Sequence, residues 1–117
     1  MAGNVADDAL VERILRAVEQ VPQGRIVSYG DIAGLVGVGP RHVGNVLGRW
    51  GSGVAWWRVT NSQGELPAPL LPEALPHWEA EGVSLKTNGR GCRIERHRAD
   101  LLELGVRWER AIADLPH

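Results

Sequence analysis

The sequence is poor in the residues that mark several large classes of protein. One of its 117 residues is a cysteine, Cys92, so an internal disulfide is excluded and a reducing compartment is expected. No apolar run approaches the roughly 20 residues that cross a bilayer, and the N-terminus lacks the basic-then-apolar order of a signal peptide. We therefore expect a cytoplasmic protein with no membrane partner.

Large aromatic side chains are also scarce. Phenylalanine is absent and tyrosine occurs once, so five tryptophans carry most of the aromatic surface. The length and a hydrophobic content of 44% suit one compact domain over residues 1–117 and are too small for two. We expect this domain to be a monomer.

A net charge is nearly lacking, because 13 lysine and arginine residues balance 14 acidic ones and leave a formal net charge of −1 at pH 7. The balance is uneven, however, since residues 21–58 hold four arginines against a single acid, Asp31. The four are Arg25, Arg41, Arg49 and Arg58. A small positive patch on a nearly neutral chain predicts few phosphate contacts and a moderate salt dependence of nucleic-acid binding.

Two helices are predicted near the N-terminus. Apolar residues recur at helical spacing after Asp7 and Asp8, which occupy the expected N-cap, and Pro22 ends this pattern. Ser28 and Asp31 have the spacing of a capping box, which predicts a second, short helix over residues 29–36.

A third helix is predicted from Pro40, which suits the first helical position, to about Arg49. The Gly-Val-Gly sequence at residues 37–39 predicts a tight turn before it. Two short helices joined by a glycine turn are typical of a helix-turn-helix, in which residues 40–50 would form the recognition helix.

Shorter elements are predicted in the second half. Residues 57–60 and 65–66 have strand-like composition and flank a turn at residues 61–64. Residues 83–86 and 92–95 bracket a glycine-containing turn, which predicts a hairpin in the position of a wing.

Two further helices complete the predicted fold. A short one covers residues 73–81 and is expected to be interrupted by Pro76, and a C-terminal one covers about residues 98–115 with Gly105 as a candidate break. All elements together predict a mainly α fold with a small β part, arranged as a winged helix-turn-helix.

The segment at residues 54–59 carries the most chemical information. Two adjacent indoles, Trp56 and Trp57, are followed by a cation, Arg58. Indole is only an N–H donor, so neither tryptophan can act as a nucleophile or a general base at neutral pH. If this segment meets Tyr29 and Arg41 in space, the group forms a cationic, aromatic-lined pocket suited to a flat ligand such as a nucleobase.

Four ordered segments resemble the DNA-binding domain of O6-alkylguanine-DNA alkyltransferases: residues 21–33, 41–44, 54–59 and 61–64. In those enzymes the active-site strip is Pro-Cys-His-Arg-Val and the cysteine accepts the alkyl group. Here the strip at residues 55–59 is Ala-Trp-Trp-Arg-Val. Replacement of that cysteine by Trp56 is the mark of alkyltransferase-like proteins, and Trp57 replaces the histidine that activates the cysteine. The resemblance therefore implies a protein that is not an enzyme and needs no cofactor.

The resemblance also implies how DNA is bound. The helix-turn-helix would enter the minor groove, flip O6-alkylguanine out of double-stranded DNA and mark it for nucleotide excision repair proteins. Arg41 would be the arginine finger that fills the vacated place. The predicted lesion pocket comprises Tyr29, Trp56 and Arg58, and the predicted contacts to the DNA backbone comprise Ser28, Asn45 and Arg49. For Arg58, pairing with an acidic side chain and contact with phosphate both stay open.

Other residues favour structural roles. Trp57 follows Trp56 on a predicted alternating strand, so it should point to the opposite face and pack rather than touch a ligand. Cys92 has no neighbouring histidine and is expected to be a small buried hydrophobe rather than a nucleophile. The four histidines share no zinc-ligand spacing with it, so no metal is expected.

The sequence is also compatible, to different degrees, with three alternative functions. A winged-helix regulator of undamaged DNA would need base-reading side chains along residues 40–50, where Gly44 and Gly48 weaken direct readout. A residual alkyltransferase is nearly excluded by the tryptophan at residue 56. A protein-interaction module is supported only by the acidic C-terminal half.

Overall fold

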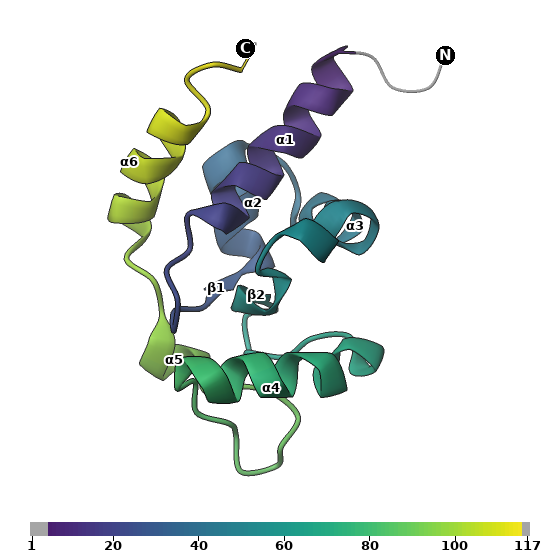
Figure 1. The fold of residues 1–117 in the computed structure, drawn as a ribbon, viewed down its shortest axis with the longest axis vertical. Coiled ribbons are helices and arrows are strands. Elements are labelled where there is room, and N and C mark those ends of the chain that lie inside the picture. Colours follow the sequence, from purple (N-terminus) through teal and green to yellow (C-terminus); the bar gives the residue numbers. More distant parts are fainter. Residues whose placement is uncertain (1–4, 116–117) are drawn as a thin grey trace.

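The computed structural model describes residues 5–115, with side chains described from Asp8 onward. Helices dominate, and two short strands form the sheet, which confirms the predicted fold class (Figure 1). The elements are α1 (Val5–Glu19), β1 (Val27–Ser28), α2 (Tyr29–Val36), α3 (Pro40–Trp50), β2 (Val59–Thr60), α4 (Leu71–Glu81), α5 (Ile94–His97) and α6 (Leu101–Ala111), with short 3-10 helices at Gly51–Gly53, Trp56–Arg58 and Ala68–Leu70. Within the described residues no helix is long and apolar enough to span a membrane.

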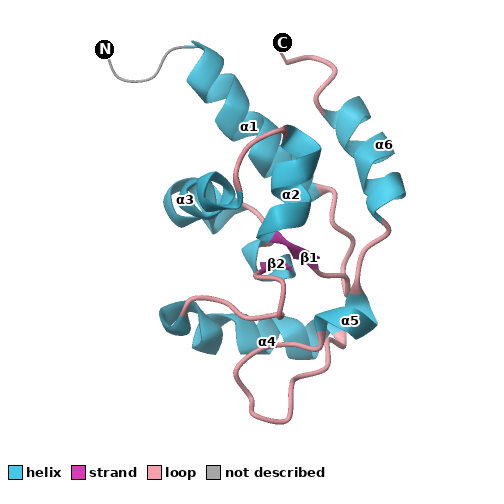
Figure 2. Ribbon diagram, turned by 180° about the vertical axis from the view of Figure 1, so that it is seen from behind, coloured by secondary structure: helices cyan, strands magenta, loops and turns pink. Residues whose placement is uncertain are grey.

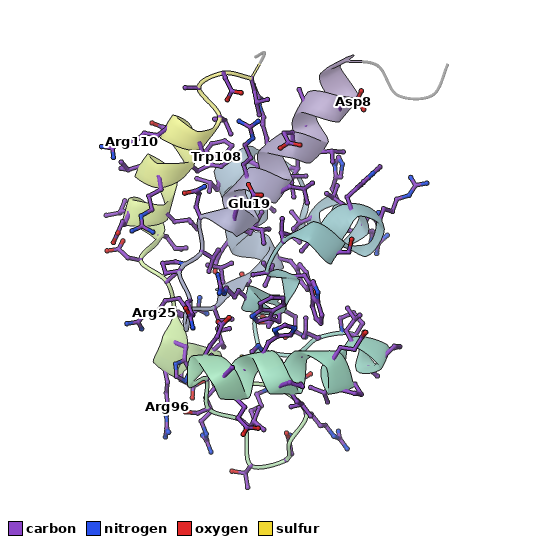
Figure 3. All side chains as sticks on the ribbon, viewed as in Figure 1. Asp8, Glu19, Arg25, Arg96, Trp108 and Arg110 are labelled. Atoms are coloured by element: carbon purple, nitrogen blue, oxygen red, sulfur yellow. The ribbon has the colours of Figure 1, made fainter. Side chains whose placement is uncertain are left out.

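The small sheet separates two groups of helices. Helices α1, α2 and α3 lie on one side of it, and α4 and α5 lie on the other (Figure 2). Helix α6 returns along α1, and Trp108 reaches from α6 to donate its indole N–H to the carbonyl oxygen of Arg13 at 2.9 Å (Figure 3). A first core joins α1, α2, α3 and α6, and a second core centres on Trp78 of α4.

The helix-turn-helix follows the local sequence signals. The Ser28 hydroxyl accepts the N–H of Asp31 at 3.0 Å, and the Asp31 carboxylate accepts the N–H of Ser28 at 2.9 Å, so the predicted capping box is present. Gly37 ends α2 with a φ of 91°, a left-handed conformation that favours glycine, and Pro40 takes the first position of α3.

Helix α1 differs from its prediction at both ends. It begins at Val5, so Asp7 and Asp8 lie inside its first turn rather than at the N-cap. Acidic residues are favourable within that turn as well, because the helix dipole is positive there. The helix ends at Glu19, where two turn hydrogen bonds, from the N–H groups of Gln20 and Val21, precede Pro22.

The predicted strand at residues 57–60 is only half present. Strand β2 pairs in parallel with β1, with Val27 opposite Val59. The two tryptophans instead lie in the 3-10 helix Trp56–Arg58, because the backbone turns at Ala55, with a ψ of 67°, and the Arg58 N–H bonds the Ala55 carbonyl at 3.1 Å. The indoles therefore do not alternate across a strand.

The helices of the second half are less broken than predicted. Helix α4 continues through Pro76, which is exposed, while Ala74 and Trp78 are buried on the opposite side and hold the helix in place. Helix α6 continues through Gly105 and is shorter than residues 98–115, because the Asp100 side chain caps it by accepting the N–H groups of its first turn at 3.0 and 3.1 Å.

The predicted hairpin is present at its tip. Leu85 and Cys92 form an antiparallel bridge, and the Lys86 N–H bonds the Gly91 carbonyl at 2.9 Å. Residues 94–97 are the helix α5 rather than a strand. The hairpin is fixed to the turn at residues 61–64 by the Cys92 N–H, which bonds the Gly64 carbonyl at 2.9 Å.

Candidate nucleic-acid interface

A cavity of about 720 Å³ opens between the helix-turn-helix and the start of α4. Tyr29 lines it from α2, Arg41 and Asn45 line it from α3, and Trp56 lines it from the 3-10 helix. These four residues come from three separate elements and were all predicted to contact DNA or its lesion. The β1–β2 pairing brings them together, because β1 leads directly into α2 and β2 follows the 3-10 helix.

Trp56 is held by aromatic contacts on one side. Its ring meets the Trp57 ring edge-on at 5.7 Å between centroids and 83° between planes, and it meets His77 at 6.2 Å and 77°. Both are T-shaped geometries that aromatic pairs favour. Trp56 is half-buried and also lines the cavity, so its indole is positioned before any ligand arrives.

Arg41 is available for a ligand. It stands in the first turn of α3, is exposed and lines the cavity. Within residues 8–115 its guanidinium has no ion pair and no hydrogen bond. An arginine without protein partners loses no intramolecular contact when it moves into DNA.

Tyr29 lines the cavity from the first position of α2. Burial raises the pKa of its phenol, so the hydroxyl keeps its proton and can donate a hydrogen bond at neutral pH. The side chain is half-buried, which suits both a wall of the cavity and a contact at its mouth.

The predicted place of Arg58 in the lesion pocket is wrong. Its guanidinium pairs with Glu81 of α4, with Nη2 and Oε2 2.8 Å apart, and its Nη1 donates to the Val21 carbonyl at 3.0 Å. The two side chains are 17% and 6% exposed. An acidic side chain and a phosphate were both open as partners of Arg58. The structure shows the acidic side chain, because a buried guanidinium needs a counter-charge.

Trp57 belongs to the same group of interacting side chains, which we call the Glu81 clamp: Trp57, Arg58, His77 and Glu81. The Trp57 N–H donates to Glu81 at 2.8 Å, and its ring stacks on His77 with centroids 3.5 Å apart. The packing role predicted for Trp57 agrees with these contacts, although strand alternation is not their cause. No local pattern marks Glu81 as the partner of Arg58, because it lies 23 residues further along the chain.

The pKa of Glu81 reflects these contacts. Burial alone would raise it, but hydrogen bonds from Arg58, from the Gly24 N–H and from Trp57 outweigh burial and hold the pKa below its ordinary value. The carboxylate is therefore charged at neutral pH, and it joins α4 to the strip that carries Trp56.

The three residues predicted to contact the DNA backbone differ in whether they line the cavity. Ser28 is 8% exposed and its hydroxyl is used in the capping box, so the residue does not line the cavity. Arg49 is exposed on α3 outside the cavity, with its guanidinium 5.3 Å from the Trp50 ring centroid. Asn45 lies between the cavity and a smaller hollow beside Arg49.

The one cysteine of the chain is remote from this site. Cys92 is fully buried in the second core, and burial raises the pKa of its thiol to about 11. A thiol in that state is protonated and unreactive at neutral pH. The prediction that Cys92 is a buried hydrophobe is confirmed.

Comparison with known proteins agrees with this arrangement. Residues 9–86 match the family model of the 6-O-methylguanine DNA methyltransferase DNA-binding domain. A DNA base-flipping protein of Vibrio parahaemolyticus is 36% identical over 89 residues, which cover 71% of this chain and 89% of the relative. A DNA base-flipping protein of Escherichia coli is 35% identical over 98 residues, which cover 79% of this chain and 75% of the relative.

Two solved structures have a similar fold. S. pombe Atl1 in complex with damaged DNA containing O6-carboxymethylguanine superposes with a TM-score of 0.69 at 26% identity, covering 80% of this chain and 96% of that one. S. pombe ATL in complex with DNA superposes with a TM-score of 0.62 at 27% identity, covering 83% and 94%. With a match to this DNA-binding domain, with DNA base-flipping proteins as relatives and with the fold of Atl1, the chain belongs to the alkyltransferase-like proteins.

Proposed function

We propose that this protein is a non-enzymatic sensor of DNA damage that binds O6-alkylguanine flipped out of the duplex. The observation that carries the proposal is the cavity that Tyr29, Arg41 and Trp56 line together. Flipping a base costs a few kcal/mol, and less for an alkylated base that pairs poorly. Stacking on an aromatic side chain returns about 1–3 kcal/mol per base, which is enough to offset much of that cost.

Helix α3 is the proposed minor-groove element. Arg41 stands in its first turn and has no ion pair or hydrogen bond in the described part of the chain. In the proposed complex its guanidinium takes the position that the flipped guanine leaves and faces the orphan cytosine. Asn45 and Arg49, further along the same exposed face, are proposed to contact the DNA backbone.

Binding without alkyl transfer is proposed on chemical grounds. The position of the acceptor cysteine holds Trp56, whose indole is no nucleophile. The thiol of Cys92 is buried in the second core and does not line the cavity. Two relatives named as DNA base-flipping proteins support the same conclusion.

Because the adduct stays in place after binding, a second system must remove it. We propose that the bound, monomeric sensor marks the lesion for nucleotide excision repair in the cytoplasm. This would be tested by comparing the removal of an O6-alkylguanine by the excision proteins in the presence and absence of the chain. An unchanged rate of excision contradicts the coupling.

The binding proposal is tested with two fluorescently labelled duplexes that differ only in carrying guanine or O6-methylguanine at one position. We expect tighter binding to the methylated duplex, measured by anisotropy, and full recovery of the methyl group on the DNA by mass spectrometry. Equal affinity for both duplexes contradicts a damage sensor and favours a regulator of undamaged DNA. Loss of methyl groups from the DNA contradicts a non-enzymatic role.

A further inference from the structure

We propose that Glu73 selects among O6-alkyl adducts by charge, so that the cavity favours adducts with a cationic end and disfavours anionic ones. This inference rests on the proposed function, because it concerns the same cavity. Glu73 lies in the first turn of α4 and lines the cavity that Trp56 also lines. Within the described residues its carboxylate has no ion pair and no hydrogen bond, so its charge is not neutralised by a protein partner.

The position of Glu73 is fixed by the far end of the same helix. Helix α4 is anchored to the 3-10 helix by Glu81, which pairs with Arg58, and by the Trp78 N–H, which donates to the Trp57 carbonyl at 2.8 Å. Trp78 itself is fully buried in the second core. Since Trp56 belongs to that 3-10 helix, the wall that would hold the base and the helix that carries Glu73 are parts of one packed unit, and the Glu73 side chain itself is exposed.

The rest of the cavity offers little other charge. The lining residues between Trp56 and Glu73 in the sequence are Leu66, Pro67 and Leu70, whose side chains are apolar. The other charged residue of the lining is Arg41. If Arg41 enters the DNA as the proposed finger, its charge leaves the cavity and Glu73 then determines the sign of the potential there.

The start of α4 opposes this effect only in part. A helix N-terminus carries roughly half of a positive charge, whereas the carboxylate carries a full negative one. The first N–H of the helix is also directed elsewhere, because the Leu71 N–H bonds the Ala68 carbonyl in the preceding 3-10 helix. The net potential at this end of the cavity is therefore negative.

The inferred preference is for a cationic adduct, whereas S. pombe Atl1 was solved with an anionic one, O6-carboxymethylguanine. The test compares three duplexes whose adducts have similar size and different charge: O6-(2-aminoethyl)guanine, O6-(2-hydroxyethyl)guanine and O6-carboxymethylguanine. Each is measured with the unmodified protein, with Glu73→Gln and with Glu79→Gln. Glu79 is the matched control, because it is an exposed acid of the same helix that does not line the cavity.

We expect Glu73→Gln to weaken binding of the aminoethyl duplex and to strengthen binding of the carboxymethyl duplex, each by about threefold relative to the hydroxyethyl duplex, as for a partly exposed charge pair. Glu79→Gln should change all three affinities by the same factor, because it removes the same charge from the approach to DNA. An aminoethyl-to-carboxymethyl ratio that is equal in Glu73→Gln and Glu79→Gln overturns the inference.

The two proposals fail in different ways. If the unmodified protein binds a plain guanine duplex as tightly as the hydroxyethyl duplex, the proposed function is overturned and this inference with it. If it discriminates the lesion but Glu73→Gln leaves the charge preference unchanged, this inference alone is overturned.

Discussion

The three residues of the 3-10 helix Trp56–Arg58 lie in two different surroundings. Trp56 borders an open cavity, whereas Trp57 and Arg58 are committed to the Glu81 clamp through a stacked ring, an ion pair and hydrogen bonds. A cavity lined by unpaired groups is preorganised only if its surroundings are rigid. The clamp supplies this rigidity, because Trp57 and His77 hold the Trp56 ring on one side and leave the rest of it facing the cavity.

The substitution with the largest expected effect is Glu81→Ala, which removes the carboxylate that Arg58 and Trp57 share. The change leaves the Arg58 guanidinium buried without its counter-charge, which costs about 3 kcal/mol of unfolding free energy. Urea denaturation measures the loss. Glu79→Ala is the control, because that side chain is exposed and makes no hydrogen bond or ion pair within the described residues. Equal stability of the two variants would mean that the clamp does not hold α4.

On the cavity side, Trp56→Ala should weaken binding of an O6-methylguanine duplex by about 2 kcal/mol through lost stacking. Since Trp56 is half-buried, the variant should remain folded by circular dichroism. The binding measurement is anisotropy of the labelled duplex. If the folded variant binds the duplex with undiminished affinity, Trp56 does not contact the lesion.

Arg41→Ala tests the helix-turn-helix side of the cavity. We expect a loss of at least about 1 kcal/mol in lesion binding, as for a lost stacking cation, and no change in stability, because the exposed guanidinium has no partner in the described part of the chain. Isothermal titration with the methylated duplex measures the first effect and thermal denaturation the second. A destabilised variant with unchanged affinity would give Arg41 a structural role.

The smallest expected effect is the pH dependence of the clamp. Burial opposes the hydrogen bonds that hold the pKa of Glu81 below its ordinary value of 4.5, so the net shift is downward. A carboxyl group whose pKa is lower in the folded state adds stability above the unfolded pKa and loses it as the pH falls through the folded pKa. The stability advantage of the unmodified protein over Glu81→Gln should therefore shrink as the pH falls below 4.5. An advantage that stays constant in urea titrations across this range would contradict the shift.

Local signals predicted the helix-turn-helix well. The capping box of Ser28 and Asp31 and the first-position Pro40 act within one turn of helix, so neighbouring residues are sufficient to specify them. The 3-10 helix at residues 56–58 could not be predicted in this way, because its aromatic composition favours a strand and the turn at Ala55 is imposed by packing against α4.

The same distinction applies to the site. Tyr29, Arg41 and Trp56 were found because they lie in segments that resemble a known family, and the structure brings all three to one cavity. Arg58 was misplaced because its partner Glu81 lies in a segment without that resemblance. Glu73 was not predicted to line the cavity for the same reason, since it lies in α4 on the other side of the sheet (Figure 1).

The stack of Trp57 on His77 also constrains how this protein can change over evolutionary time. A histidine at residue 57, as in the strip Pro-Cys-His-Arg-Val of the alkyltransferases, would remove the indole that bonds Glu81 and stacks on His77. That exchange would lower the stability of the folded chain. The clamp thus makes residue 57 harder to exchange than the residues that only line the cavity, because its exchange alone would break the contacts with Glu81 and His77.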